Sequence, residues 1–198
     1  NNMIDLPDTT YNEEKDGIIP IVAGVYPAHI SGLDSRDLTT KAGEQKVFNI
    51  TFLIPKEVEN TQVSKMIKNG HGELTQATDE NGQPMTIPAS FMTGKRFNSV
   101  GIWLTPNPDE GQGWKNRKYK EFFENVGVTF PTNKKGDTLL AEVEGEDIIG
   151  HPCFIKLGQE RYTKDGEERS VWKAFEVFPW TAGEKLSQDE VDSDDLPF

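Results

Sequence analysis

The sequence predicts a mainly β fold: a small five-stranded barrel with one helix between its third and fourth strands, an insertion, and a disordered acidic tail. Three observations support this prediction. Polar and apolar residues alternate along Lys46–Ile54, as in a half-buried strand. Apolar residues recur at helical spacing along Trp114–Val126. Asp165-Gly166, a strong hairpin turn signal, separates two further β-like segments.

Composition and charge divide the chain into parts. Of the 198 residues 34 % are hydrophobic, and 11 Phe, 4 Trp and 4 Tyr are enough for one core. The net charge is -12, yet Phe91–Lys120 holds six basic residues against two acidic ones, so the acid is concentrated at the two ends. We therefore predict an acidic arm at 1–17, a barrel domain at 18–182 with an insertion at 55–93, and an acidic tail at 183–198.

The first two strands are predicted on either side of a polar turn region, Asp34–Glu44. The opening strand falls within Ile18–Ile30. A break is expected near Pro20 or Pro27, because proline inside a strand indicates an edge or an irregular start. The core face of the second strand consists of Phe48, Ile50, Phe52 and Ile54.

The third strand is predicted at Gly94–Thr105. We expect Phe97 and Trp103 to point outward, with Ser99 and Gly101 leaving room for a flat ligand between the two rings. The core face of this strand would then hold Val100, Ile102 and Leu104.

The helix Trp114–Val126 is followed by Gly127, a common helix stop, and by two more strands, Ile148–Gln159 and Ser170–Phe178. The core face of the helix consists of Tyr119, Phe122, Phe123 and Val126. This order of strands and helix is the layout of the OB-fold, a five-stranded Greek-key barrel. The insertion 55–93 is a functional loop, a lid, an oligomer contact or a surface decoration, and the sequence leaves these open.

A surface that binds single-stranded nucleic acid without reading bases needs basic groups for the phosphates and flat aromatic rings for the bases. The third strand, the start of the helix and the last two strands offer both. The candidate DNA-binding residues are Lys95, Arg96, Phe97, Trp103, Lys115, Arg117, Lys118, Phe154, Lys156, Arg161 and Tyr162. Two alternatives stay open: the insertion could cover the rings of the third strand, and the basic residues of the helix could form a solvated surface.

The sequence closes on an acidic stretch, Glu184–Phe198. As a free terminus, Phe198 would fill an apolar pocket, its α-carboxylate would meet an Arg or Lys, and nearby Asp residues would be attracted to a basic rim. We therefore predict a partner-binding tip made of Asp194, Asp195, Leu196, Pro197 and Phe198. The alternative is a solubilising tail without a partner.

Two resemblances follow from these motifs. The tip resembles the C-terminal tip of bacterial single-stranded DNA-binding proteins, Asp-Asp-Asp-Ile-Pro-Phe. From about Gly24 to Trp180, the chain resembles the OB-fold single-stranded DNA-binding proteins of tailed phages, including the T7 type. The similar pieces are Gly94-Lys95-Arg96, Trp114-Lys115, Phe122-Phe123, Asp147-Ile148-Ile149-Gly150 and Tyr162-Thr163-Lys164-Asp165-Gly166 before Trp172.

The resemblance implies sequence-independent binding and protection of single-stranded DNA during phage DNA replication, recombination and repair. It also implies that the acidic tail competes with DNA for the basic groove and recruits a polymerase, a helicase-primase or a nuclease. The insertion and the N-terminal arm depart from a minimal OB domain. A homodimer is left open.

We expect no enzyme activity, no cofactor and no metal site. His29, His71 and His151 lack metal-ligand spacing, and no nucleophile motif stands out. The single cysteine, Cys153, and the lack of a long apolar stretch predict a soluble intracellular protein without a membrane partner. The resemblance to phage proteins implies that this compartment is the cytoplasm of an infected bacterial cell. The main alternative function is a phage structural or adaptor protein that docks partners through its C-terminal tip without binding DNA. RNA single strands are a second alternative ligand.

Overall fold

The computed structural model describes residues 8–11, 21, 23–41, 43–68, 70–71, 74–106, 108 and 111–180. The predicted tail 183–198, with its partner-binding tip, and most of the predicted arm 1–17 fall outside these residues. The domain boundaries at both ends of the chain therefore stay predictions.

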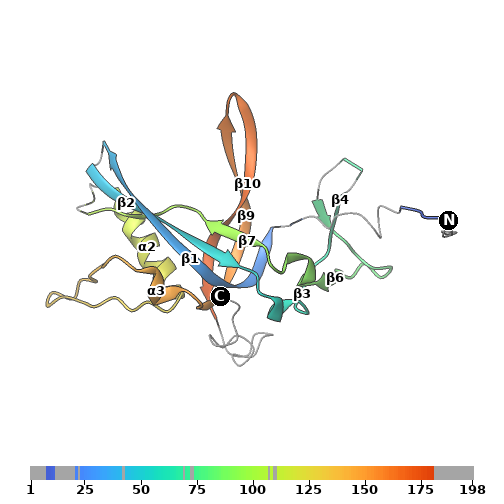
Figure 1. Ribbon diagram of the computed structural model, residues 1–198, viewed down its shortest axis with the longest axis horizontal. Helices are drawn as coiled ribbons and strands as arrows, with labels where there is room; N and C mark the ends of the chain where they lie inside the picture. Colours follow the sequence, from blue (N-terminus) through green and yellow to red (C-terminus); the bar gives the residue numbers. More distant parts are fainter. Residues whose placement is uncertain are drawn as a thin grey trace, which may run out of the picture.

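The fold is a closed five-stranded barrel of mixed strand direction (Figure 1), mainly β as predicted. The third barrel strand is interrupted and consists of two short strands, β7 and β8. The barrel strands are β1 (Gly24–Thr40), β2 (Gly43–Leu53), β7 (Arg96–Ser99), β8 (Ile102–Leu104), β9 (Pro152–Lys164) and β10 (Glu167–Pro179).

The pairing of the strands closes the barrel. β1 pairs with β2 and β9, β2 pairs with β7 and β8, and β10 pairs with β9 and β7. The β7–β10 pairing is parallel, and the other pairings of the barrel are antiparallel. The order around the barrel is therefore first, second, third, fifth and fourth strand. This arrangement, with a helix before the fourth strand, is compatible with an OB-fold-like barrel.

The main helix, α2 (Gly113–Asn125), lies between the third and fourth barrel strands, as predicted, and a short helix, α3 (Gly145–Ile148), precedes β9. Because aromatic side chains recur along one face of α2, that face packs on the barrel: the ring of Tyr119 meets the edge of Phe48, with 5.3 Å between ring centroids. The predicted core faces of the second strand and of the helix are confirmed, with Phe48, Ile50, Phe52, Ile54, Tyr119, Phe122, Phe123 and Val126 all buried.

The first strand differs from its prediction. β1 continues to Thr40, so most of the predicted turn region Asp34–Glu44 is strand. Pro27 does not break it, because Pro27 pairs with Phe154 of β9 at a level where β2 has not yet joined β1. A missing backbone N–H is tolerated on such an unpaired side.

The predicted outward direction of Phe97 is wrong, since this ring is 6 % exposed in the core. The cause is the interruption between β7 and β8. Asn98 lies opposite Thr51 of β2, whereas Ile102 lies opposite Phe48, so the third strand uses one residue more than β2 over this stretch. One extra residue reverses the alternation, which brings Phe97 and Ile102 to the same side.

The insertion 55–93 is partly built into the core of the barrel. Val58 on η1 (Lys56–Val58), and Ala89 and Met92 on η2 (Ala89–Met92), are at most 1 % exposed and pack with the apolar residues of the barrel. Between them lie β3 (Gln62–Ser64), β4 (Met66–Lys68), β5 (Leu74–Gln76) and β6 (Thr86–Pro88). The β4–β5 hairpin projects to the right of the barrel in Figure 1. The base of the insertion is therefore a structural part of the domain.

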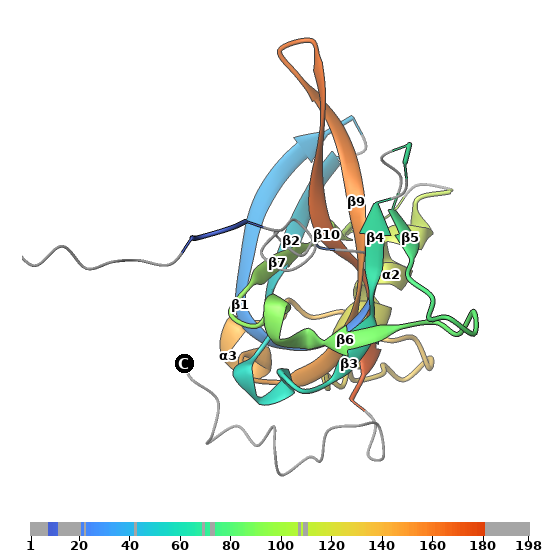
Figure 2. The same cartoon turned by 90° about the vertical axis from the view of Figure 1, so that its right-hand side faces the viewer.

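The β9–β10 hairpin extends beyond the barrel as a free ribbon (Figures 1 and 2). Every residue from Gln159 to Val171 is exposed. The ribbon turns at Asp165 and Gly166, whose φ angles of 53° and 78° suit a two-residue type I′ turn. The predicted hairpin is confirmed.

Candidate nucleic-acid interface

Three side chains form a row across the outer surface of the barrel: Arg36 on β1, Val47 on β2 and Trp103 on β8. Arg36 lies directly opposite Val47, and Val47 lies opposite Trp103. Directly opposed residues of antiparallel strands point to the same side, and the neighbouring Phe48 and Ile102 point into the core. The row therefore faces outward, with Val47 buried, Trp103 half-buried and Arg36 exposed.

Lys115, in the first turn of α2, completes this row. Its Nζ lies 5.0 Å from the centroid of the Trp103 ring, within the range of a cation–π contact. The same ammonium donates a 2.9 Å hydrogen bond to Oε1 of Gln45. The ring centroid of Trp114, a residue that is 44 % exposed, lies 6.0 Å from the same ammonium. The sequence did not single out Gln45 or Trp114 as part of this site.

Neutral partners position this ammonium. Among the described residues, Lys115 has no ion pair with a carboxylate, whereas Lys120 on the same helix pairs with Glu124 at 3.0 Å. The first turn of α2 carries no acidic residue, so Lys115 meets the positive end of the helix dipole without compensation. Helix stability therefore does not explain a lysine here.

A buried polar network fixes the end of α2 against β8. Asn116 forms two 2.9 Å hydrogen bonds with the backbone of Thr105. Its Oδ1 accepts from the N–H of Thr105, and its Nδ2 donates to the carbonyl of Thr105. Thr105 donates from Oγ1 to Gln45 at 3.2 Å, and Gln45 donates to Oγ1 of Thr40 at 2.8 Å. Because Gln45 is only 3 % exposed, this network holds Lys115 in place before any ligand arrives.

Gly101 leaves the edge of the indole uncovered. A Cβ at this position would lie 3.1 Å from Cγ2 of Val47 and 3.4 Å from Nε1 of Trp103. Ser99, which was expected beside it, is instead buried, and its Oγ accepts a 2.9 Å hydrogen bond from the N–H of Ile50. The open space beside the indole therefore results from the missing side chain of Gly101 and not from Ser99.

The outward surface continues along β7 toward the ribbon. Asn98 lies opposite Thr51 and beside Lys173 of β10, and Arg96 lies exposed opposite Leu53. At about 3.3 Å of rise per residue, Arg96 lies roughly 20 Å from Trp103. We call this outward surface the strip; its residues are Arg36, Arg96, Asn98, Trp103, Lys115 and Lys173.

The strip is mainly but not uniformly basic. Lys95, also exposed, precedes Arg96 at its far end. The register places Asp34 opposite Asn49 on the same outer side, so one carboxylate lies near the row of Arg36. The Trp103 ring is partly covered by the Lys115 ammonium.

The other two predicted residues of α2, Arg117 and Lys118, are both exposed. Arg117, two residues after Lys115, lies on the opposite side of the helix and therefore away from Trp103. Lys118, three residues after Lys115, lies one turn further along the same face, beyond Lys115 as seen from the start of the helix.

Phe154 and Lys156 lie on the outer side of β9, between β1 and β10. The Phe154 ring stacks on Trp180, with 4.9 Å between centroids and 10° between ring planes. Lys156 faces Glu176 of β10, with 3.7 Å between Nζ and Oε2. These two predicted residues belong to a second surface, which meets the strip at Lys173.

The two predicted residues of the ribbon lie on its opposite faces. Tyr162 is 43 % exposed and lies opposite Arg169, on the same side of the ribbon as Lys173 of the strip. Arg161 is on the other side, where it pairs with Glu168 at 3.5 Å. Tyr162 therefore extends the strip, and Arg161 does not.

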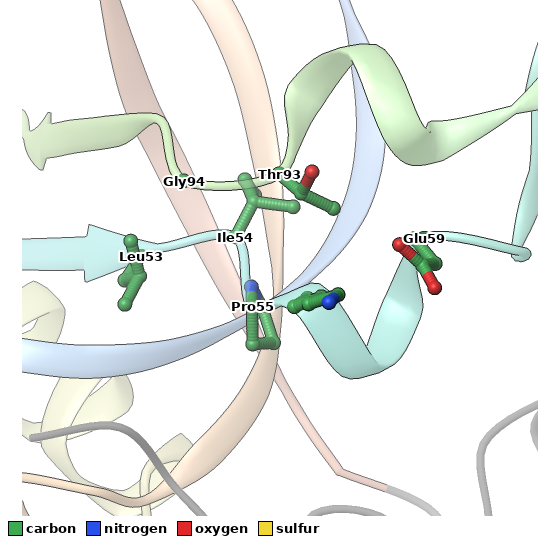
Figure 3. Close-up of a pocket in the computed structure, with 7 residues that line it drawn as sticks. Leu53, Ile54, Pro55, Glu59, Thr93 and Gly94 are labelled. Atoms are coloured by element: carbon green, nitrogen blue, oxygen red, sulfur yellow. The ribbon is translucent and has the colours of Figure 1, made fainter.

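A cavity of about 330 Å³ opens where the insertion leaves and rejoins the barrel (Figure 3). It is lined by Leu53, Ile54, Pro55, Lys56, Glu59, Thr93 and Gly94. A second cavity of about 320 Å³ lies under the β1–β2 hairpin, beside Lys46 and Glu142. Neither cavity brings together an arrangement of nucleophile and base.

Most of the altered pKa values belong to buried groups outside the strip. The exception is Lys46, whose pKa is raised by its hydrogen bond to Glu142. Burial lowers the pKa of His29 to about 4 and raises the pKa of Tyr26 to about 12. Burial also raises the pKa of the Cys153 thiol, which keeps this group protonated. Within the described part of the chain, no group of three or more His, Cys, Asp or Glu side chains could hold a metal ion, and no helix is long and apolar enough to cross a membrane.

No known protein family and no curated protein matches the chain. The interface is thus defined by its own geometry: a half-buried indole, a fixed ammonium and a line of basic and polar side chains on β1, β7 and β10. The predicted tip residues Asp194 to Phe198 lie outside the described residues.

Proposed function

We propose that the protein binds single-stranded DNA without regard to sequence and protects it during DNA replication, recombination and repair. Bases stack on the exposed part of Trp103, and phosphates meet Arg36, Arg96 and Lys115. The observation that supports this most strongly is the Lys115 ammonium, held beside Trp103 by a neutral amide at a helix end where its charge costs stability.

The strip combines the two groups that such binding requires. A base that stacks on an aromatic ring contributes about 1–3 kcal/mol, and a cation that meets a phosphate releases condensed counterions. Trp103 supplies the first group, and Lys115 and Arg36 on either side of it supply the second. Because the Gln45 network already fixes Lys115, little ordering cost remains for the ligand to overcome.

The position of the strip fits an OB-fold-like barrel. In that fold, nucleic acid lies on the second and third strands, between the first–second and fourth–fifth loops. Here the strip runs from Arg36 on β1 across β2 at Val47 to β8 and β7, and ends at Lys173 on β10. The β1–β2 and β9–β10 hairpins extend from the barrel (Figure 1). We include in the proposal that the protein is a phage single-stranded DNA-binding protein.

The acidic segment 184–198 is part of this proposal as a competitor. Its six carboxylates against one lysine favour contact with the basic strip, and single-stranded DNA would displace it. The released segment would then recruit replication or recombination proteins. The function thus couples DNA occupancy to partner recruitment.

The test is a titration of labelled oligo-dT, and of a duplex of equal length, followed by fluorescence anisotropy. We expect oligo-dT to bind more tightly than the duplex, because only unpaired bases offer a free face for stacking. Trp103→Ala should lose about 1–3 kcal/mol of oligo-dT affinity, roughly five- to 150-fold, and Trp103→Phe should retain most of it. Removal of 189–198 should tighten binding at low salt.

Lys120→Ala is the matched control, since Lys120 lies on the same helix but pairs with Glu124. It should bind oligo-dT like the wild type. If neither oligo-dT nor the duplex binds, or if Trp103→Ala binds as well as Lys120→Ala, the strip is not a DNA surface. The adaptor hypothesis, in which the protein only docks partners, would then take its place.

A further inference from the structure

A second surface exposes apolar side chains on the outer side of β1, β9 and β10 and meets the strip at Lys173. Val25 is 53 % exposed and Phe178 is 39 % exposed, although both lie within strands of the barrel. Large apolar side chains that stay exposed on a regular sheet, close to one another, are typical of contact surfaces.

The register shows that these side chains are neighbours. Phe154 of β9 lies opposite Phe178 of β10. Two residues further along β9, Lys156 lies between Val25 of β1 and Glu176 of β10. All five point away from the core, because the alternate residues Ile155 and Val177 are buried. We call this surface the aromatic patch; its residues are Val25, Phe154, Lys156, Glu176 and Phe178.

The patch is rigid and electrically balanced. The Phe154 ring is held by its stack on Trp180. Lys156 and Glu176 are each more than half exposed and stand 3.7 Å apart, so the pair contributes little to the fold. One positive and one negative side chain, side by side, give the patch no net charge, which does not favour a phosphate backbone.

We propose that the aromatic patch is the contact surface between two copies of this chain. A two-fold axis that runs along the strands, between β9 and β10, brings β9 of one copy over β10 of the other. Lys156 then faces Glu176 of the second copy, and Phe154 faces its Phe178, twice in each dimer. The patch is thus complementary to itself: aromatic side chains face aromatic side chains, and each charge faces an opposite charge.

The size of the patch sets the strength of the contact. Five side chains from three strands cover less than the roughly 800 Å² per partner of a standard stable interface. The dimer is therefore weak and exchanges between subunits. The strip meets the patch only at Lys173, which lies near Glu176 on β10, so the rest of the strip stays accessible in both copies. The inference does not depend on DNA binding.

Reciprocal charge reversal tests the contact. Lys156→Glu and Glu176→Lys each place like charges opposite one another in a dimer of identical copies. Each variant alone should raise the dissociation constant of the dimer more than about tenfold, as measured by sedimentation equilibrium of the full chain. An equal mixture of the two variants should form dimers again, because every facing pair in the mixed dimer is then of opposite sign.

The mixture distinguishes the contact from a loss of folding, since two misfolded variants cannot restore one another. Lys120→Glu makes the same change of charge outside the patch, in the Lys120–Glu124 pair, and should leave the dimer unchanged. The proposal is overturned if the wild type sediments as a monomer up to its solubility limit. It is also overturned if the dimer persists in both reversal variants, or if their mixture stays monomeric.

Discussion

At the scale of single residues, the barrel fixes the charge state of groups in its core. His29 on β1 is fully buried, and burial lowers its pKa to about 4. Cys153 on β9 is buried as well, and its raised pKa keeps the thiol neutral. The charged side chains that remain available to a ligand are therefore the surface ones, such as Lys115 and Arg36 on the strip.

His29 makes the stability depend on pH. Above about pH 6.5 the imidazole is neutral in both the folded and the unfolded chain and adds no pH dependence. As the pH falls from about 6.5 to about 4, the unfolded chain binds a proton that folded His29 excludes, so the free energy of unfolding decreases. At about pH 5 the loss amounts to roughly 2 kcal/mol.

Urea denaturation at about pH 7.5 and about pH 5 measures this loss. His29→Gln has no titrating group at this position, so its free energy of unfolding should decrease by roughly 2 kcal/mol less between the two pH values. The same decrease in the variant as in the wild type would assign the pH dependence to other groups.

At the scale of elements, the β9–β10 ribbon is held by its own ladder and turn rather than by the core. Its residues from Gln159 to Val171 are exposed on both faces. Tyr162 and Arg169 on its outer face continue the line of Lys173 and Asn98. We therefore expect the ribbon to contribute more to ligand binding than to stability.

Shortening the ribbon separates these two roles. Replacing residues 161–170 by Asn-Gly keeps the Glu160–Val171 pair, which is hydrogen-bonded like the native closing pair Lys164–Glu167, as the closing pair of a two-residue turn. We expect the melting temperature to change little, because no buried side chain is removed, and the affinity for oligo-dT to decrease severalfold. Thermal unfolding and anisotropy titration check the two expectations. A large drop in melting temperature would show that the ribbon supports the barrel.

The sequence predicted the elements well where a pattern is long and one-sided. Lys46–Ile54 alternates against the core, α2 carries a complete apolar face, and Asp165-Gly166 defines its turn. It failed for Phe97, because one extra residue between β7 and β8 reverses the faces while each short strand still alternates. Sequence periodicity does not reveal such an insertion.

Parts of the site were missed for a different reason. Arg36 lies where β1 leaves the barrel, and both faces of the strand are then near solvent, so no alternation marks it as strand. Gln45 lies at the edge of the regular pattern, and its burial results from contacts with Thr105 and Lys115, which are distant in sequence. Only the fold brings these residues together.

At the scale of the whole molecule, the barrel carries two different surfaces on its outer side. The basic strip runs from Arg36 on β1 past Trp103 and β7 to Lys173 on β10, whereas the aromatic patch lies around β9, at the other end of β1 and near the end of β10. The excess acid of the chain, which brings the net charge to -12, is concentrated in segments 1–17 and 184–198 of the sequence. A chain of negative overall charge can therefore still present a local phosphate-binding surface.

The salt dependence of oligo-dT binding tests the central claim most directly. The logarithm of the association constant should fall linearly with the logarithm of salt concentration, and each phosphate contact adds about 0.7 to the slope for a single strand. Lys115→Ala should reduce the slope by about 0.7, while Lys120→Ala should leave it unchanged. A wild type that does not bind oligo-dT, or a slope that Lys115→Ala does not alter, would contradict binding of single-stranded DNA on the strip.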